Sequence, residues 1–213
     1  MRQDLFPTAS VKLGELVERQ ADRIAEAAMA VIDEYGTAGF TMRAVAKVLN
    51  VTPMALYHHV KDKAELAAIM VDATMRQIPL PPTCGTWRED LISMSKWIRE
   101  ITHAHPAARH LRRDFQIFTP TVLQVVERWL SLWQQSELSF EKALLAARSS
   151  STAITGFVME EITIREITPP EASTLSMLPN ARIMVEGLYD QSREFELAAI
   201  AIIDGIYGQL KEK

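Results

Sequence analysis

Apolar residues recur every three to four positions through most of the 213-residue chain, and no useful stretch alternates apolar and polar residues. Spacing of three and four places side chains on one face of a helix, whereas a half-buried strand requires a period of two. The pattern therefore predicts an all-α fold. The length allows one large domain or two small ones, and a hydrophobic content of 48% excludes a disordered chain.

Cysteine content and hydropathy exclude further classes of protein. The single cysteine, Cys84, excludes an internal disulfide and an all-cysteine zinc site. No apolar run approaches the roughly 18 residues of a membrane span, and the first residues lack a signal-peptide pattern. We therefore expect a cytoplasmic protein with no membrane partner.

The sign of the charge changes along the chain. The net charge of -4 argues against non-specific coating of nucleic acid. Residues 1–40 are acidic on balance, whereas residues 41–63 carry four lysines or arginines and a single acid, Asp62. The second segment is therefore the candidate for contact with a polyanion.

Helix signals at the front of the chain predict three helices. The first runs from about Leu13 to Tyr35 and ends at Gly36 and Gly39. Thr41 can then cap a short second helix, because its hydroxyl accepts a hydrogen bond from a free backbone N–H of the first turn.

A tight turn separates the second helix from the third. Asn50 tolerates the left-handed conformation, Thr52 can cap, and Pro53 suits a first helical position because its missing N–H has no partner there. The third helix then reaches about His59. This layout is that of a helix-turn-helix, although the spacing alone also allows an ordinary corner between two helices.

Residue types after the turn favour a DNA-binding helix. Val51, Leu56 and Val60 are expected to face the core, which leaves small, aromatic and imidazole side chains outward. Arginine and lysine suit phosphates, and the apolar positions suit thymine methyl groups. The expected DNA-contacting residues are Thr41, Met42, Arg43, Thr52, Pro53, Met54, Ala55, Tyr57, His58, His59 and Lys63.

The segment 40–63 resembles the DNA-binding signature of the TetR family of bacterial transcriptional regulators. The matching positions are Thr41, Arg43, Val45, Ala46, Leu56, Tyr57 and Lys63. Asn50 replaces the usual glycine and Val60 the more common phenylalanine, but asparagine also accepts the turn and valine keeps a core contact. The resemblance, specific over residues 19–70, implies a homodimer that places two recognition helices on double-stranded operator DNA.

Beyond this segment the chain is similar to the tetracycline-repressor branch of that family, at Trp87 and around Phe195. That branch senses a drug with a magnesium ion. Only His110 falls near a metal-ligand position of the branch, while Met94 and Ile98 replace an amide and a phenyl ring. Tetracycline is therefore not the expected effector, and no metal or cofactor is expected.

A proline-rich break at residues 79–85 divides the chain. It separates an N-terminal helix-turn-helix domain with its connecting helix, residues 1–78, from a helical effector-binding and dimerisation domain, residues 86–213. In the second domain, Thr86 and Glu89 form a capping box, and Thr119–Pro120 opens another helix with Leu123, Val126, Leu130 and Trp133 on one face.

The last part of the chain predicts two long helices with a loop between them. The first runs from Ser139 to about Arg165, residues 167–180 form the loop, and the last helix runs from Ser192 to Leu210. Both long helices are apolar or small nearly all round. We expect them to pair two subunits, with an internal core role as the alternative.

Large residues on the middle helices are candidates for an apolar effector pocket with few polar anchors. They are Met94, Trp97, Ile98, His110, Phe115, Phe118, Trp129, Trp133 and Phe157. Core packing is the alternative for each of them. Arg112 and Arg113 are interpreted as a solvated face rather than as ligands of an anion.

Catalytic patterns are weak. Glu100 and His103 form one Glu-x-x-His, whereas a di-iron bundle requires two copies and further carboxylates. No phosphate-binding glycine loop or nucleophile elbow is present. We therefore expect a regulator rather than an enzyme: a repressor released from a palindromic operator by an unknown small molecule. The alternative is a helical small-molecule binding protein or enzyme without DNA binding.

Overall fold

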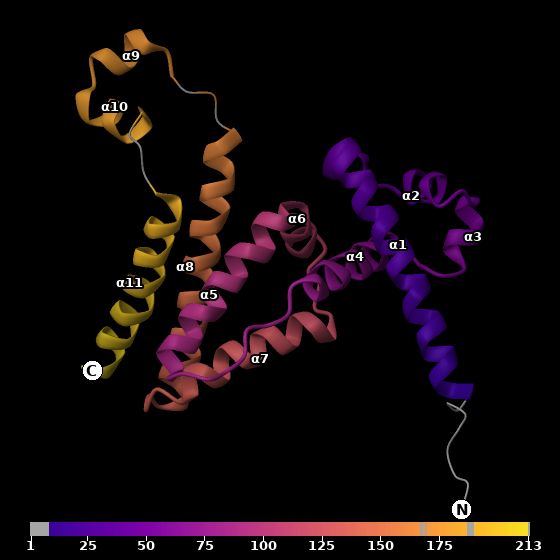
Figure 1. Cartoon of the computed structure of the whole chain (residues 1–213), viewed down its shortest axis with the longest axis horizontal. Helices are drawn as coiled ribbons and strands as arrows, with labels where there is room; N and C mark the ends of the chain where they lie inside the picture. The colour runs from indigo at the N-terminus through magenta and orange to yellow at the C-terminus, as the bar shows by residue number, and fades with distance from the viewer. Residues whose placement is uncertain (1–8, 167, 169, 187–189, 213) are drawn as a thin grey trace, which may run out of the picture. The chain divides into compact units, whose positions relative to one another are not determined.

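Eleven α-helices and no strand make up the regular secondary structure of this computed structural model over the residues it describes, 9–166, 168, 170–186 and 190–212 (Figure 1). This confirms the prediction of an all-α fold. None of the described helices is long and apolar enough to cross a membrane.

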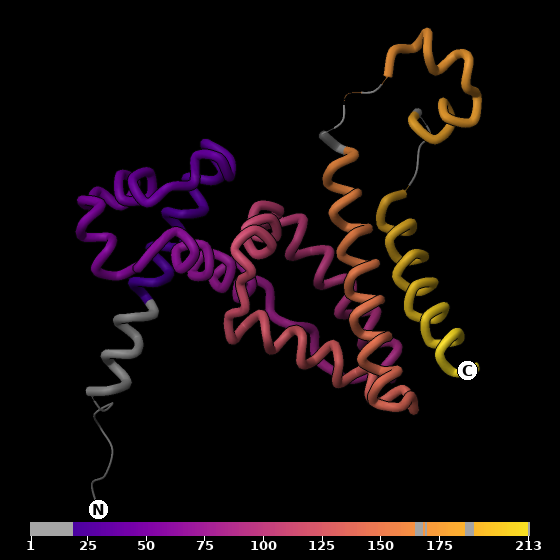
Figure 2. The backbone as a smooth tube through the Cα atoms, turned by 180° about the vertical axis from the view of Figure 1, so that it is seen from behind, coloured from indigo at the N-terminus to yellow at the C-terminus, as the bar shows by residue number. Residues whose placement is uncertain are grey.

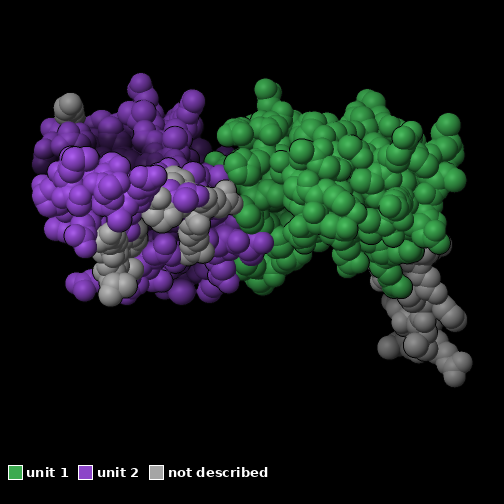
Figure 3. Space-filling model, turned by 90° about the horizontal axis from the view of Figure 1, so that it is seen from above, with its two compact units in different colours: residues 1–79, 105–125 green, residues 80–104, 126–213 purple. Residues whose placement is uncertain are grey.

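The helices form two compact units (Figure 3). Unit 1 comprises residues 1–79 and 105–125, and unit 2 comprises residues 80–104 and 126–213. The sequence division placed residues 105–125 in the second domain. In the structure Ala108, Leu111, Ile117 and Val122 are buried in the core of unit 1, and this packing groups the segment with the N-terminal helices.

Unit 1 contains five complete helices: α1 (Ala9–Gly39), α2 (Met42–Val48), α3 (Pro53–Tyr57), α4 (Lys63–Gln77) and α6 (Pro106–Asp114). α1 packs against α2, α4 and α6 around fully buried residues such as Phe40, Val45 and Leu66. Gly36 interrupts α1 with a φ of 66°, a backbone conformation that glycine adopts without steric cost. A last turn then reaches Gly39, so the helix is broken at Gly36 and ends at Gly39, the two glycines where the sequence predicts its end.

Unit 2 is built on α5 (Trp87–Ala104), α8 (Phe140–Glu166) and α11 (Gln191–Lys211), which pack against one another. Figure 2 shows α8 and α11 running side by side. The predicted capping box begins α5: the Thr86 N–H donates to Glu89 Oε2 at 2.8 Å, and the Glu89 N–H donates to Thr86 Oγ1 at 3.3 Å.

Two expectations for the C-terminal half of the chain are wrong in part. Residues 172–176 form α9 (Ala172–Ser176) and residues from Pro179 form α10 (Pro179–Glu186), where the sequence predicted a loop to residue 180. Pro179 opens a helix there, because a first helical position needs no N–H. In α7 (Pro120–Gln134) the predicted Trp133 is buried, but Leu123 and Val126 are exposed, and Val122 and Trp129 are buried instead.

Candidate nucleic-acid interface

The helix-turn-helix forms as the sequence predicts. The Thr41 hydroxyl accepts the Ala44 N–H at 3.1 Å and caps α2, and the Thr52 hydroxyl accepts the Ala55 N–H at 3.1 Å and caps α3. Asn50 has a φ of 55°, in the left-handed region, and Pro53 is the first residue of α3. Local side-chain hydrogen bonds therefore fix both short helices at their N-terminal ends.

Two buried residues orient α3. Leu56 and Val60, four residues apart, lie in the core of unit 1, and the Val60 N–H donates to the Leu56 carbonyl at 3.0 Å. Met54 is consequently 68% exposed, and Tyr57 also reaches solvent. Val51 was expected in the core but is 43% exposed, because it belongs to the turn, and the partly buried Leu49 packs against the core instead.

Most of the residues expected to contact DNA lie at the surface. Thr41, Arg43, Thr52, Pro53, Met54, Tyr57, His58 and His59 are exposed, while Ala55 and Lys63 are half-buried. Met42 is a correction: its side chain is only 8% exposed and joins the hydrophobic core. The first residue of α2 therefore points inward, and only its backbone remains available at the helix start.

Positive charge on this surface is uncompensated. Arg43, Lys47 and Lys61 are exposed, and no carboxylate of the described residues forms an ion pair with them. The only acid of the segment, Asp62, is used as the cap of α4, where it accepts the Glu65 N–H at 2.9 Å. Such a surface attracts an anion, and the anion does not have to displace a carboxylate of the protein from these side chains.

Aromatic and polar contacts hold the edge of the surface in place. The Lys63 ammonium lies 5.5 Å from the centroid of the Phe40 ring and 5.8 Å from that of Phe115, in cation–π geometry. His59 Nε2 lies 3.1 Å from Gln20 Nε2 of α1. Two of the predicted contacts are thus anchored on neighbouring elements before any DNA is bound.

The predicted effector residues are spread over both units. Met94, Trp97, Trp129 and Trp133 are buried in unit 2, and Ile98 and Phe157 are partly buried there. His110 and Phe115 are partly buried in unit 1, where Phe118 is 67% exposed. Whether they line an effector pocket stays a prediction.

Two of these residues have satisfied polar atoms. The ring N–H groups of Trp129 and Trp133 both donate to the Ser150 hydroxyl, at 3.1 and 3.0 Å. Ser150 in turn donates to the Ala146 carbonyl at 2.6 Å. The two indoles are therefore fixed by helix α8, as packed core residues are.

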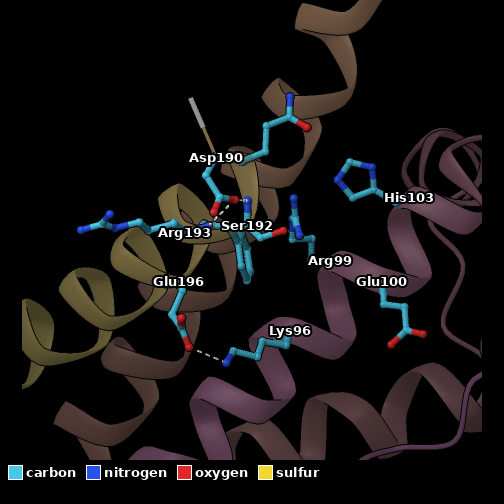
Figure 4. Close-up of a pocket in the computed structure, with 10 residues that line it drawn as sticks. Lys96, Arg99, Glu100, His103, Asp190, Ser192, Arg193 and Glu196 are labelled. Carbon is cyan, nitrogen blue, oxygen red and sulfur yellow. Dashed lines mark hydrogen bonds and ion pairs between the residues drawn. The ribbon is translucent and has the colours of Figure 1, made fainter. Parts of the chain in front are cut away.

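A cavity of about 1040 Å³ lies in unit 2 between α5 and the start of α11 (Figure 4). Its charged groups are largely paired: Lys96 Nζ lies 2.6 Å from Glu196 Oε1, and Asp190 Oδ1 accepts the Ser192 N–H at 3.0 Å. None of the nine predicted residues lines it. Sequence reasoning missed it because its polar residues come from two helices about 100 positions apart and look like solvated faces.

Two residues that line the cavity, Arg99 and His103, belong to an ionic cluster around the buried Glu161. Glu161 of α8 accepts hydrogen bonds from Arg99 at 2.8 Å and lies 3.0 Å from His103 Nε2. Burial opposes ionisation, but the bonds from Arg99 and His103 outweigh it, so the pKa of Glu161 is lower than its ordinary value. The described residues contain no cluster of three or more side chains suited to a metal ion.

Two family profiles match consecutive parts of the chain. The family described as "Bacterial regulatory proteins, tetR family" matches residues 24–69, which contain the helix-turn-helix. The family described as "Tetracyclin repressor-like, C-terminal domain" matches residues 78–210.

Curated relatives share these parts. The HTH-type transcriptional repressor DrrR1 of Streptomyces coeruleorubidus is 32% identical over 113 residues, which are 52% of this chain and 42% of DrrR1. An HTH-type transcriptional regulator of Saccharopolyspora erythraea is 28% identical over 158 residues, which are 74% of this chain and 66% of that protein. The alignments therefore span less than two thirds of the length of either relative.

The fold also matches a solved structure. Apo ActR from Streptomyces coelicolor aligns with a TM-score of 0.71 and 25% identity, over 90% of this chain and 96% of ActR.

Proposed function

Because this chain belongs to the TetR family of bacterial regulatory proteins, we propose that it is a repressor that binds a palindromic operator as a homodimer. The observation that carries the proposal is the surface of α3, where capped, exposed residues lie beside cations that have no carboxylate partner. One such helix reads only a few base pairs, and two held one helical turn of DNA apart read both half-sites.

The proposed contacts follow from side-chain chemistry. Arg43 and Lys63 bind phosphates, and Tyr57 and His59 bind a phosphate or a base edge. The apolar surfaces of Pro53, Met54 and Ala55 contact thymine methyl groups. These three side chains bring no hydrogen-bond donor, so part of the specificity comes from His58, from Thr52 and from the shape of the DNA.

Exposed apolar residues on α8 and α11 support the homodimer. Leu144 and Leu145 of α8 and Leu197 of α11 are exposed in the single chain. A shallow apolar groove also lies between the two helices, lined in part by Leu145, Ile206 and Leu210. A second copy that covers these helices would bury surface that is costly to leave in water.

The proposal also includes release of the operator when a small-molecule effector binds. A small molecule that binds unit 2 or the α6 region lowers operator affinity only if it binds better to a state in which the two recognition helices are wrongly spaced. The six predicted residues that belong to unit 2, Met94, Trp97, Ile98, Trp129, Trp133 and Phe157, remain the proposed lining of a mostly apolar pocket. The protein is proposed to act without catalysis and without a cofactor.

Titration of the purified protein with DNA from upstream of its own gene tests the proposal. At two salt concentrations, wild type should bind one site tightly, with affinity falling steeply as salt rises. Arg43→Ala should weaken binding, whereas Arg193→Ala, which removes an exposed arginine of unit 2, should not. Equal, weak binding to every DNA fragment would instead favour a helical small-molecule binding protein.

A further inference from the structure

Helix α6 carries three arginines within one and a half turns, and they differ in their surroundings. Arg113 is 74% exposed at its side chain and pairs with Asp114 at 3.1 Å. Arg109 and Arg112 are half-buried. The interpretation of Arg112 and Arg113 as a solvated face therefore describes Arg113 and not Arg112.

Arg109 and Arg112 have no anionic partner in the described part of the chain. No carboxylate of a described residue lies within 4.0 Å of either guanidinium. Arg112 Nε is moreover buried and makes no hydrogen bond. A buried cation without a partner is costly, because its lost hydration is not replaced.

Two other buried polar atoms lack a hydrogen bond, but their side chains are paired elsewhere. Asp72 forms an ion pair with Arg76 through its second oxygen, and Arg128 donates to the Pro81 carbonyl through Nη2. Arg112 differs from both, because no atom of its guanidinium has a described partner.

The electrostatics of α6 agree with this geometry. Burial lowers the pKa of Arg109 to about 10, and the positive charges of Arg112 and Arg113 contribute. Burial also lowers the pKa of Arg112. Arg109 and Arg112 are three residues apart and so lie on the same face of the helix, where one anion can reach both.

Cations in the last turn of a helix are favoured by the helix dipole, and Arg112 and Arg113 lie there. The helix dipole is a sufficient reason for Arg113, because this side chain stays exposed to solvent in the last turn of α6. The helix dipole does not explain why the Nε atom of Arg112 is buried and makes no hydrogen bond. The cavity beside α5 offers no comparable feature, because most of its charges are already paired.

We propose that Arg109 and Arg112 bind the carboxylate of an organic acid, and that this acid belongs to the effector class of the protein. Guanidinium groups match carboxylates in bidentate geometry, which two neighbouring arginines provide. Phe115, the C-terminal cap of α6, is only partly buried and supplies apolar surface beside the arginines, which suits an organic body rather than an inorganic ion. The effector role rests on the proposed function, whereas the anion site itself does not.

Thermal unfolding of the full chain in a buffer of low anion content first tests whether Arg109 and Arg112 lack an anionic partner. Arg112→Met and Arg109→Met keep the length of the side chain and remove the charge, so the melting temperature Tm should rise. Arg113→Met removes an exposed, paired arginine and should leave Tm nearly unchanged. A lower Tm for both Arg112→Met and Arg109→Met would reveal partners and overturn the proposal.

Titration with sodium benzoate at constant ionic strength tests the ligand class. At tenfold excess over its dissociation constant, benzoate should raise the Tm of wild type and Arg113→Met by about 3 to 6 °C. Arg112→Met should show no such rise. An equal rise with inorganic phosphate would assign the site to inorganic anions and contradict the carboxylate class, and the absence of any arginine-dependent rise would overturn the site.

The same preparations separate this proposal from the proposed function. No DNA is present in the Tm titration. If wild type shows an Arg112-dependent benzoate shift but binds no upstream DNA, the repressor proposal fails and the anion site stands. If wild type binds upstream DNA and shows no such shift, only the anion site fails.

Discussion

Single side chains decide where the short helices of unit 1 begin. α3 has only five residues, too few for a helix to persist alone in water. Thr52 supplies its cap, Asn50 supplies the left-handed turn before it, and Leu56 ties it to the core. The position of every proposed base contact therefore depends on a few local bonds.

Replacement of Thr52 tests the role of the cap. Thr52→Ala should lower the free energy of unfolding by about 1 kcal/mol, because the Ala55 N–H loses its acceptor. Operator affinity should fall as well, because α3 frays. Urea unfolding and DNA titration measure the two effects, with the exposed Thr37→Ala as the control. Unchanged unfolding of Thr52→Ala would show that the hydrogen bond contributes nothing.

Lys63 and Ala55 should behave differently toward DNA. Lys63→Ala should weaken binding to all sequences and reduce the salt slope by roughly one unit, because one phosphate contact is lost. Ala55→Ser should change which sequence is preferred, because Ala55 is placed at a base edge. Competition among operator variants at two salt concentrations measures both. An equal loss at every base variant on changing Ala55 would contradict its placement.

At the scale of helices, the contact between α5 and α8 contains a buried carboxylate that is paired with two cationic side chains. Glu161 of α8 binds Arg99 and His103 of α5, and all three residues are mostly shielded from solvent. The carboxylate joins positions about 60 residues apart. Ion pairs of this kind contribute only while the acid is ionised.

The pH dependence of stability tests this contact. The pKa of Glu161 is lowered on folding, so its contribution is present above its ordinary value of 4.5 and is lost as the pH falls through the lowered value. Glu161→Gln should therefore be less stable than wild type at pH 7, with a difference that shrinks on acidification. Urea unfolding at several pH values measures it. Glu160→Gln, an exposed neighbour, should unfold like wild type throughout.

At the scale of the whole molecule, the proposed function requires two copies. The exposed apolar residues of α8 and α11 are the proposed pairing surface, and the groove between these helices extends it. An interface of this kind is more apolar than ordinary protein surface and loses its stability when a charge is buried in it.

A charge in the groove should separate the subunits. Leu145→Glu should shift the sedimentation mass from twice the 24.0 kDa of the chain to a single copy, and it should weaken operator binding strongly. Leu178→Glu, at an exposed position between α9 and α10, is the control. A dimer that persists in Leu145→Glu would place the interface elsewhere.

Local sequence was sufficient for the features that depend on neighbours along the chain. The caps at Thr41, Thr52 and Thr86 and the turn at Asn50 are predicted and found, because each involves residues within four positions. The burial of Leu56 follows from helical spacing in the same way. The helical character and the helix-turn-helix were accessible for this reason.

Contacts between distant segments settled the rest. Met42 turns inward, α6 packs with the N-terminal helices, and the Nε atom of Arg112 is buried without a hydrogen bond. In α7 the predicted Trp133 is buried, but Val122 and Trp129 are buried where the sequence predicted Leu123 and Val126. The period of a helix indicates that one face is buried, but which face is covered, and by what, depends on elements that pack against it from elsewhere in the chain.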